Sequence, residues 1–325
     1  MPSQTYLGAA ALLAAALVPA PASAADLFEA EPAALLRSET FSGEAFVGHL
    51  SATAREYVYA VPGDHSKVSQ LDWRIDNALA VGGRLTFRPL DWLSVRARGW
   101  ATVADDSSMT DYDWLAGYQG PASWTHRSIH PDTRLARAVQ GDVSVAARFW
   151  DTGDTHLSVI GGYRHLNMKW KAYGGSYVYS SAAGYRALVG TFPASELGIT
   201  YEQTWETPYL GLGASASIDD VTVTGEVIGS GWVNARDHDH HVVRRILFDE
   251  SFAPSTMIGA TLGIEYRLNP LVSLTGRAEY QRYFEAKGAT RLHDIDTGIT
   301  YHYPKPAAGA DAETLLLSVG AKARL

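Results

Sequence analysis

The longest regular pattern in this 325-residue chain lies in residues 68–88, "VSQLDWRIDNALAVGGRLTFR". Its odd-numbered positions carry the large apolar residues, including Leu71, Trp73 and Leu85, whereas the charged residues stand at even-numbered positions. Successive side chains of a strand point to opposite faces, so this period of two predicts a strand with one apolar and one polar face. Soluble strands are usually about 5–6 residues long, and a strand of about twenty is typical of a tall barrel.

The same alternation recurs along the chain and predicts ten strands. They are expected at 44–60, 68–88, 93–103, 139–149, 156–173, 197–213, 221–233, 253–268, 272–286 and 313–325. Short connections are expected at 89–91, 151–155, 217–220 and 269–271, and they alternate with 61–67 and with the long stretches 104–137, 174–196, 234–252 and 287–312. This alternation favours an all-β, ten-stranded antiparallel transmembrane β-barrel with short periplasmic turns and long extracellular loops. A secreted β-sandwich is the alternative.

The N-terminal stretch "YLGAAALLAAALVPAPASA" (6–24) is apolar and ends in a small-x-small pattern typical of signal-peptide cleavage. It predicts that residues 1–24 are a signal peptide and that 25–325 form a single barrel domain, with strands from about 44 to 325. An uncleaved anchor or a buried helix is the alternative, because no Lys or Arg precedes the apolar run. No later segment has about 18 uninterrupted apolar residues, so any membrane role requires strands.

Composition narrows the classes of partner. The net charge of −8 and pI near 5.7 argue against nucleic acid, since phosphate binding needs a basic surface. An acidic protein with a concave site would instead attract cationic ligands. The chain has no cysteine, which excludes disulfides, thiolate metal sites and thiol nucleophiles.

A first candidate for chemistry is the pair Asp111 and Asp113 in "MTDYDW" (109–114). Two positions apart in extended backbone, the carboxyls point the same way. Like charges this close resist ionising together, which raises one pKa and leaves a carboxylate able to accept a proton near neutral pH. A solvated acidic loop is the alternative, because two further aspartates, Asp105 and Asp106, stand just upstream.

A second candidate is "VNARDHDHHVV" (233–243), in which Asp237, Asp239 and His241 share one face of a strand. A carboxylate two positions from a histidine can orient the imidazole as a general base. The same three residues could also hold a zinc ion, which remains a minority hypothesis. The apolar alternation, extended without interruption, would place Asp111 and Asp239 on the outer face; a bulge at the glycines of 228–233 would reverse this.

Six motifs along the chain resemble those of the omptins, the outer-membrane proteases of Gram-negative bacteria: "KVSQLDW" (67–73), "MTDYDW" (109–114), "HPDT" (130–133), "GGSYVYSS" (174–181), "FP" (192–193) and "SGWVNARDHDHH" (230–241). The resemblance runs in the same order from about residue 44 to the end. It implies a ten-stranded barrel in the cell outer membrane, monomeric, whose active site faces the extracellular side.

The resemblance also implies roles for individual residues. Asp111, Asp113, Asp239 and His241 would activate a water that attacks the scissile carbonyl, without a metal or other cofactor. Glu56 and Asp237 would receive the basic side chain before the cut, so cationic peptides or proteins are the expected substrates.

Two departures from the family pattern limit what the resemblance implies. His126 stands where the family often has an acidic residue, which bears on the preference after the cleaved bond. The second departure concerns lipopolysaccharide, the family's activating lipid. Of the positions that bind it in the family, Tyr163 is kept, but the acidic and basic partners are replaced by His165, Asn167 and Thr204.

Two other functions fit the same residues. A catalytically silent barrel, either an adhesin or a narrow pore, would keep the scaffold without the reaction. A zinc-dependent hydrolase would use the histidines of 238–241 as ligands, although no H-E-x-x-H motif occurs in the chain.

Overall fold

The computed structural model describes residues 40–115 and 123–325, and the expected signal peptide lies outside these described residues. Within them, no helix is long and apolar enough to cross a membrane. The described chain forms twelve strands, β1 (Phe41–Tyr59), β2 (Lys67–Leu90), β3 (Leu93–Asp113), β4 (His126–Asp151), β5 (Thr155–Tyr173), β6 (Ser176–Ser181), β7 (Gly184–Thr191), β8 (Leu197–Ile218), β9 (Val221–His241), β10 (Ile246–Arg267), β11 (Val272–Asp294) and β12 (Thr300–Arg324).

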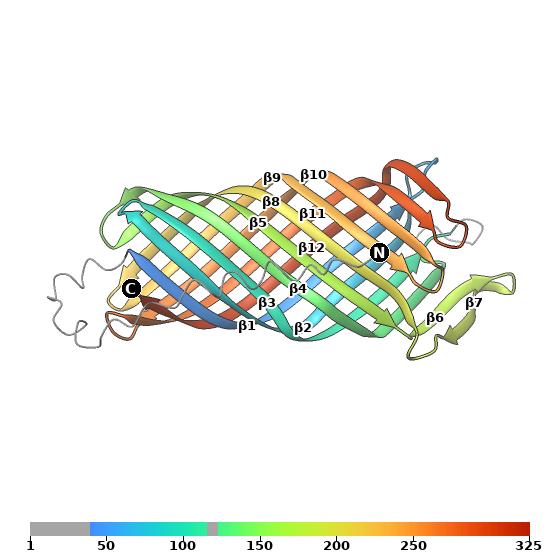
Figure 1. Ribbon diagram of the computed structural model, residues 1–325, viewed down its shortest axis with the longest axis horizontal. Coiled ribbons are helices and arrows are strands. Elements are labelled where there is room, and N and C mark those ends of the chain that lie inside the picture. The colour runs from blue at the N-terminus through green and yellow to red at the C-terminus, as the bar shows by residue number, and fades with distance from the viewer. Residues whose placement is uncertain (1–39, 116–122) are drawn as a thin grey trace, which may run out of the picture. The chain divides into compact units, whose positions relative to one another are not determined.

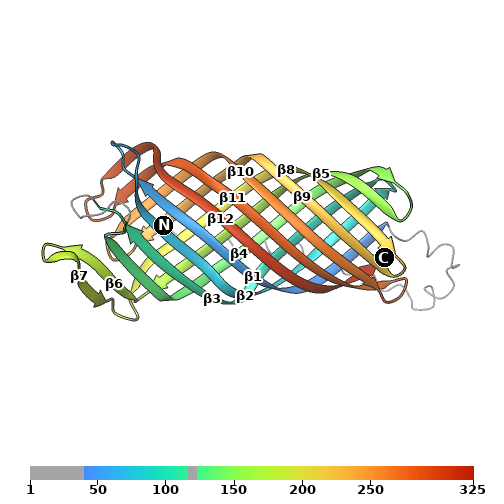
Figure 2. The same ribbon diagram turned by 180° about the vertical axis from the view of Figure 1, so that it is seen from behind.

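These strands build one closed barrel of tilted antiparallel strands (Figures 1 and 2). The order around the sheet is β3-β2-β1-β12-β11-β10-β9-β8-β5-β4, and β3 pairs with β4 to close the ring. The first and last strands pair from Ser42 opposite Arg324 to Val58 opposite Ala308. β6 and β7 form a hairpin that pairs with β4 and projects from one end of the barrel (Figure 1).

The prediction of an all-β barrel is confirmed. The described chain has twelve strands where ten were expected, because ten strands close the ring and β6 and β7 add a hairpin, and the expected long loops are shorter in the structure. The hairpin β6–β7 lies in 174–196, which was expected to be a loop. Most of the other long connections are also strand, and residues 242–245 alone join β9 to β10. The alternation was not recognised there because the outward-facing residues of these extensions are polar instead of apolar.

The outer surface of the barrel changes character along its length. In the half that holds the short turns, every strand of the closed ring presents large apolar side chains outward. This apolar belt comprises Val47, Leu79, Val81, Val103, Val143, Val145, Val159, Leu210, Leu212, Val223, Val227, Ile258, Leu262, Ile264, Leu274, Leu315, Leu317 and Val319. Toward the end with the β6–β7 hairpin, the outward residues form a charged collar of Arg74, Asp76, Arg137, Glu202, Arg236, His238, Asp249 and Arg291.

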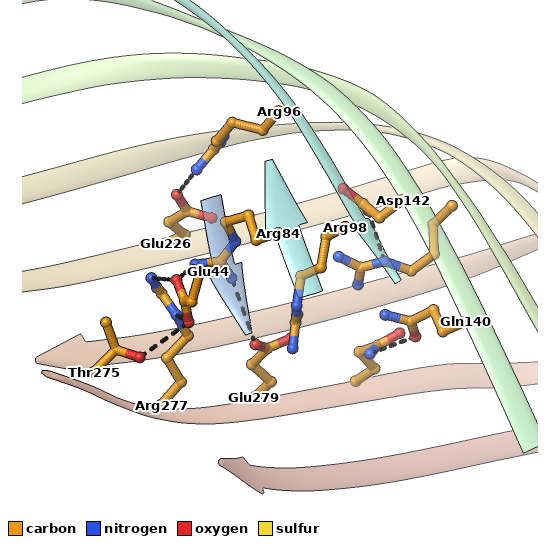
Figure 3. A network of polar contacts seen from close by, with 12 residues as sticks. Glu44, Arg84, Arg96, Arg98, Gln140, Asp142, Glu226, Thr275, Arg277 and Glu279 are labelled. Atoms are coloured by element: carbon orange, nitrogen blue, oxygen red, sulfur yellow. Dashed lines mark hydrogen bonds and ion pairs between the residues drawn. The ribbon is translucent and has the colours of Figure 1, made fainter. Parts of the chain in front are cut away.

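Inside the belt, the barrel is filled by charged side chains (Figure 3). This arginine network comprises Glu44, Arg84, Arg96, Arg98, Asp142, Arg164, Glu226, Arg277 and Glu279. Its bonds cross the lumen: Arg96 on β3 pairs with Glu226 on β9, and Arg98 on β3 pairs with Glu279 on β11. A cavity of about 40 Å³ remains among them. A filled interior is expected for a barrel of this size and disfavours an open pore.

Above the arginine network, at the level where the collar begins, the interior is aromatic. This aromatic layer consists of Trp73, Trp170, Tyr201, Trp205 and Tyr283, all fully buried. The rings of Trp73 and Tyr201 stack with their centroids 5.3 Å apart, and those of Trp205 and Tyr283 lie 4.7 Å apart. Such ring pairs combine a large buried apolar area with a specific geometry, so the aromatic layer is a rigid support for the residues at the collar end of the barrel.

β-Bulges separate the two halves. On β2 the register against β3 shifts between Ile75 and Asn77, and the inward face changes from odd to even positions. Ile75 is therefore buried whereas Leu79 is 48% exposed, so the predicted single apolar face is in fact two opposite faces. β9 changes face in the same way between Ile228 and Val233, within the glycine stretch where a bulge was considered.

Candidate active site

Asp111 and Asp113 lie near the end of β3, beyond the apolar belt, where a change of face like that of β2 has turned odd positions inward. The Ser69 hydroxyl of neighbouring β2 donates to Oδ1 of Asp111 at 3.4 Å. Burial, and then the charge of Asp113, raise the pKa of Asp111 to about 7, and burial also raises the pKa of Asp113. The two carboxyls thus hold a proton between them close to neutral pH.

Asp239 and His241 face inward at the end of β9, also beyond the belt. The Asp239 side chain is fully buried, and its Oδ2 lies 2.8 Å from Nε2 of His241. Burial opposes a charged imidazole, but the Asp239 carboxylate outweighs it and raises the pKa of His241. Phe248 of β10 packs edge-on against the imidazole, with centroids 5.4 Å apart, which helps to fix the ring.

The two pairs face each other across the mouth of the barrel. β3 and β9 are not neighbours, since β4, β5 and β8 separate them on the shorter path around the ring. The charges nevertheless interact: protonated His241 lowers the pKa of Asp111, and Asp111 in turn raises that of His241. A polar mouth with an acid pair on one wall and an acid–imidazole pair on the other can hold and deprotonate a water.

Arg244, in the 242–245 turn, is a residue that the sequence reasoning missed. Its positive charge lowers the pKa of Asp111, Asp113 and His241. The only sequence signal for it was its place three residues after His241. The stretch was interpreted as part of a long loop, for which no position could be derived.

A group of acids lies beside these two pairs. Glu56 on β1 and Asp237 on β9 are buried, as is Glu250 on β10, which the sequence reasoning did not identify. The Tyr201 hydroxyl donates to Oδ2 of Asp237 at 2.9 Å. Burial, and then the charge of Asp239, raise the pKa of Glu56 and bring that of Asp237 to about 8. The structure thus brings together every candidate site residue and adds Glu250.

Other histidines of interest lie elsewhere. His238 faces outward in the charged collar and pairs with Asp249 of β10. His126, opposite Asp113 in the β3–β4 register, packs its ring against Tyr179 at 5.1 Å. Among the described residues, no group of three or more His, Asp or Glu side chains is arranged to hold a metal ion.

The positions compared with the family's lipopolysaccharide site lie on the outer wall. Asn167 of β5 donates to Oγ1 of Thr204 at 2.8 Å and to Oε1 of Glu202 at 2.9 Å, and Arg137 donates to its Oδ1 at 2.6 Å. Tyr163, lower on the same strand, is 48% exposed.

Comparison with known proteins agrees with this fold. The omptin family pattern matches residues 37–325. Outer membrane protease OmpP of Escherichia coli K12 is 32% identical over 295 residues, which are 90% of this chain and 93% of that protein. The plasminogen activator of Yersinia pestis is 31% identical over 287 residues, 88% and 90% of the two chains. The crystal structure of outer membrane protease OmpT from Escherichia coli superposes with a TM-score of 0.85 at 28% identity, covering 89% and 98%.

The fold and the relatives define a β-barrel peptidase of the bacterial outer membrane. The chain belongs to the omptin family. It is an outer-membrane endopeptidase that acts on peptide or protein substrates, and the resemblance inferred from its motifs is confirmed.

Proposed function

We propose that this endopeptidase cleaves cationic peptides and proteins next to Arg or Lys, with water activated between Asp111–Asp113 and Asp239–His241. The observation that carries the proposal is the mutual electrostatic effect of Asp111 and His241, which come from opposite walls of the barrel mouth. Placed between them, one water can contact both a shared carboxyl proton and an imidazole.

In the proposed reaction, Nδ1 of His241 accepts a proton from the water, because Nε2 is engaged by Asp239 at 2.8 Å. The Asp239 carboxylate stabilises the imidazolium that results. The water oxygen attacks the scissile carbonyl carbon, while the protonated member of the aspartate pair donates to the carbonyl oxygen. When the C–N bond breaks, the imidazolium returns its proton to the leaving amine, and the former carbonyl oxygen returns its proton to the aspartate pair. We propose that no metal takes part, since none of these transfers needs one.

The substrate preference follows from the buried acids. Oε2 of Glu56 and Oδ1 of Asp237 are buried and have no hydrogen-bond partner among the described residues. A guanidinium or ammonium group that enters supplies the missing donors and the opposite charge. For the residue after the cut, His126 replaces the acid common in the family, which favours a less basic preference there.

The orientation of the barrel follows from its two ends. Short turns typically face the periplasm in outer-membrane barrels, so we propose that the collar end and its active site face the exterior. The barrel strands have enough outward apolar residues to cross the bilayer as a monomer. At the former lipopolysaccharide positions, Asn167 bonds to Thr204 instead of presenting a charge, which favours weaker dependence on that lipid.

The test is cleavage of a fluorogenic Arg-containing peptide by refolded protein and by Asp111→Asn and His241→Ala. Each substitution is expected to lower kcat/KM by at least ~100-fold, the usual contribution of general base catalysis. Asp249→Asn, on the outer wall beside the site, is the matched control and should stay within about twofold. Equal rates for all four proteins would contradict the assignment, and loss of activity on exhaustive chelation would favour the zinc hypothesis instead.

A further inference from the structure

Glu250 occupies the acid group without a role in the reaction described above. It lies on β10 directly opposite Asp237 of β9, and only 5% of its surface is exposed. The Thr290 hydroxyl donates to Oε1 at 2.7 Å, whereas Oε2 is buried and has no hydrogen-bond partner among the described residues. Glu56, Asp237 and Glu250, from three different strands, thus each direct into the interior a carboxyl oxygen that has no donor from another type of side chain, and the carboxyls of Asp237 and Glu250 lie within hydrogen-bond reach of each other.

The groups that face Glu250 from the surrounding strands are acidic or neutral. They are Glu56 of β1, Tyr201 of β8, Asp237 and Asp239 of β9, and Thr290 of β11. Among the described residues, no Lys or Arg forms an ion pair with Glu56, Asp237 or Glu250. Buried carboxylates without a counter-charge cannot all remain ionised, so the empty pocket has to hold protons.

We propose that Glu250 is a third carboxyl group of the pocket for the basic side chain, protonated when the pocket is empty and deprotonated when that side chain enters. The proton passes to solvent, and the carboxylate that remains pairs with the guanidinium or ammonium of the substrate. The idea rests on the proposed preference for Arg or Lys and adds a specificity-determining residue to it.

The arrangement around Glu250 supports the exchange. In the empty pocket its carboxyl proton can bridge to Asp237 opposite, which favours the acid form of one and the anion of the other. Burial, and then the charge of Asp237, raise the pKa of Glu250, in line with this pairing. A cation that enters reverses the balance, because opposite charge within a few ångströms favours ionised carboxyls.

Binding of a basic side chain is therefore linked to proton release, which fixes the direction in which KM changes with pH. While Glu250 is protonated in the free enzyme and ionised in the complex, KM falls as the pH rises, by at most about tenfold per pH unit for one proton. The dependence of kcat belongs to His241 and the aspartate pair. Discrimination between Arg and uncharged Gln in the substrate should also increase with pH.

The test is a comparison of wild type with Glu250→Gln, which keeps the shape and a donor toward Asp237 but cannot ionise. KM for the Arg peptide is measured from pH 5.5 to 8.5. We expect KM of the variant to be within about twofold of wild type at pH 5.5 and roughly tenfold higher at pH 8.5, as for one lost proton exchange. kcat should keep its pH profile, and Asp249→Asn, the adjacent acid on the outer wall, should follow wild type throughout.

Calorimetry provides an independent measurement. The full-length His241→Ala chain is titrated with the Arg peptide at pH 6.5 in two buffers of different ionisation enthalpy, which gives the number of protons released. Adding Glu250→Gln should lower this number by about one. A His241→Ala chain that releases no proton, or an unchanged slope of KM against pH in Glu250→Gln, overturns the inference while wild type still cleaves at Arg. A wild type that cleaves no Arg peptide overturns the proposed function itself.

Discussion

The two halves of this barrel differ in how the charged side chains of the interior are compensated. In the belt half the outside is apolar and the interior charges are paired, as in the contact of Arg277 with Glu44 at 3.1 Å. In the collar half the outside is charged, and the interior acids Glu56, Asp237 and Glu250 form no ion pair with a Lys or Arg among the described residues. Breaking a buried ion pair is costly because it leaves an uncompensated charge, and unpaired buried charges are retained where a function requires them. The difference indicates which half serves stability and which serves function.

The strongest test of this comparison removes one member of the paired set. Glu279 is 3% exposed and pairs with Arg98, and its Oε1 lies 3.9 Å from Arg84. Glu279→Ala leaves buried arginine charge uncompensated, which typically costs about 3–5 kcal/mol. The free energy of unfolding is measured by urea titration in lipid vesicles, and the folded fraction should retain wild-type kcat. Full stability in this variant would show that the network does not support the scaffold.

The next test compares the outer surfaces of the two halves on one strand. Val227 lies in the apolar belt and is 64% exposed, whereas Asn234 is exposed on β9 beyond it. Val227→Arg should destabilise the barrel in vesicles by about 2–4 kcal/mol, because it places a charge against the acyl chains. Asn234→Arg should change the free energy of unfolding by less than about 0.5 kcal/mol. Equal costs at both positions would mean that the belt does not mark the membrane boundary.

The smallest expected effect is a gain in stability instead of a loss. It comes from replacing Asp237, one of the interior acids without an ion-pair partner. Asp237 has a pKa of about 8 in the folded chain against an ordinary 3.8, so the folded state binds the proton more tightly. The contribution of Asp237 to stability is therefore fully present below about pH 4 and declines as the pH rises from about 4 to 8. Asp237→Asn removes this decline and should raise the melting temperature at pH 8 by about 2–4 °C, the change that about 1 kcal/mol produces in a large domain. At pH 4 the two proteins should melt together; a lower melting temperature at pH 8 would show that the acid is stabilising.

The alternation of apolar and polar residues was sufficient to predict a barrel. It did not predict which face points inward beyond a bulge, because the inward positions change there from odd to even or the reverse. Leu71 and Leu79 have the same parity in the sequence, yet one is buried in the interior and the other faces outward. The bulge between them depends on register with β3, which a local pattern does not contain. The strand extensions that carry the site were interpreted as loops for a related reason, because polar residues cover both faces there.

The residue pairs of the site that lie on a single strand could be predicted from the sequence. A spacing of two identifies Asp111 with Asp113 and Asp239 with His241, because neighbours on one face are set by the backbone alone. Glu250 comes near these residues only through the pairing of β9 with β10, which no local pattern contains, and Arg244 is placed by the short turn that joins these two strands. The catalytic and binding roles assigned to the six predicted residues remain predictions that the substitutions above can test.

The stacked rings of Trp73, Trp170 and Tyr201 have a consequence beyond packing. They form a slab of fully buried rings between the arginines below and the carboxyls above. Without this slab, a guanidinium from below could bend upward and neutralise the acids permanently. The aromatic layer thus keeps the protein's own positive charges apart from the buried acids, which the proposed binding of a basic side chain requires.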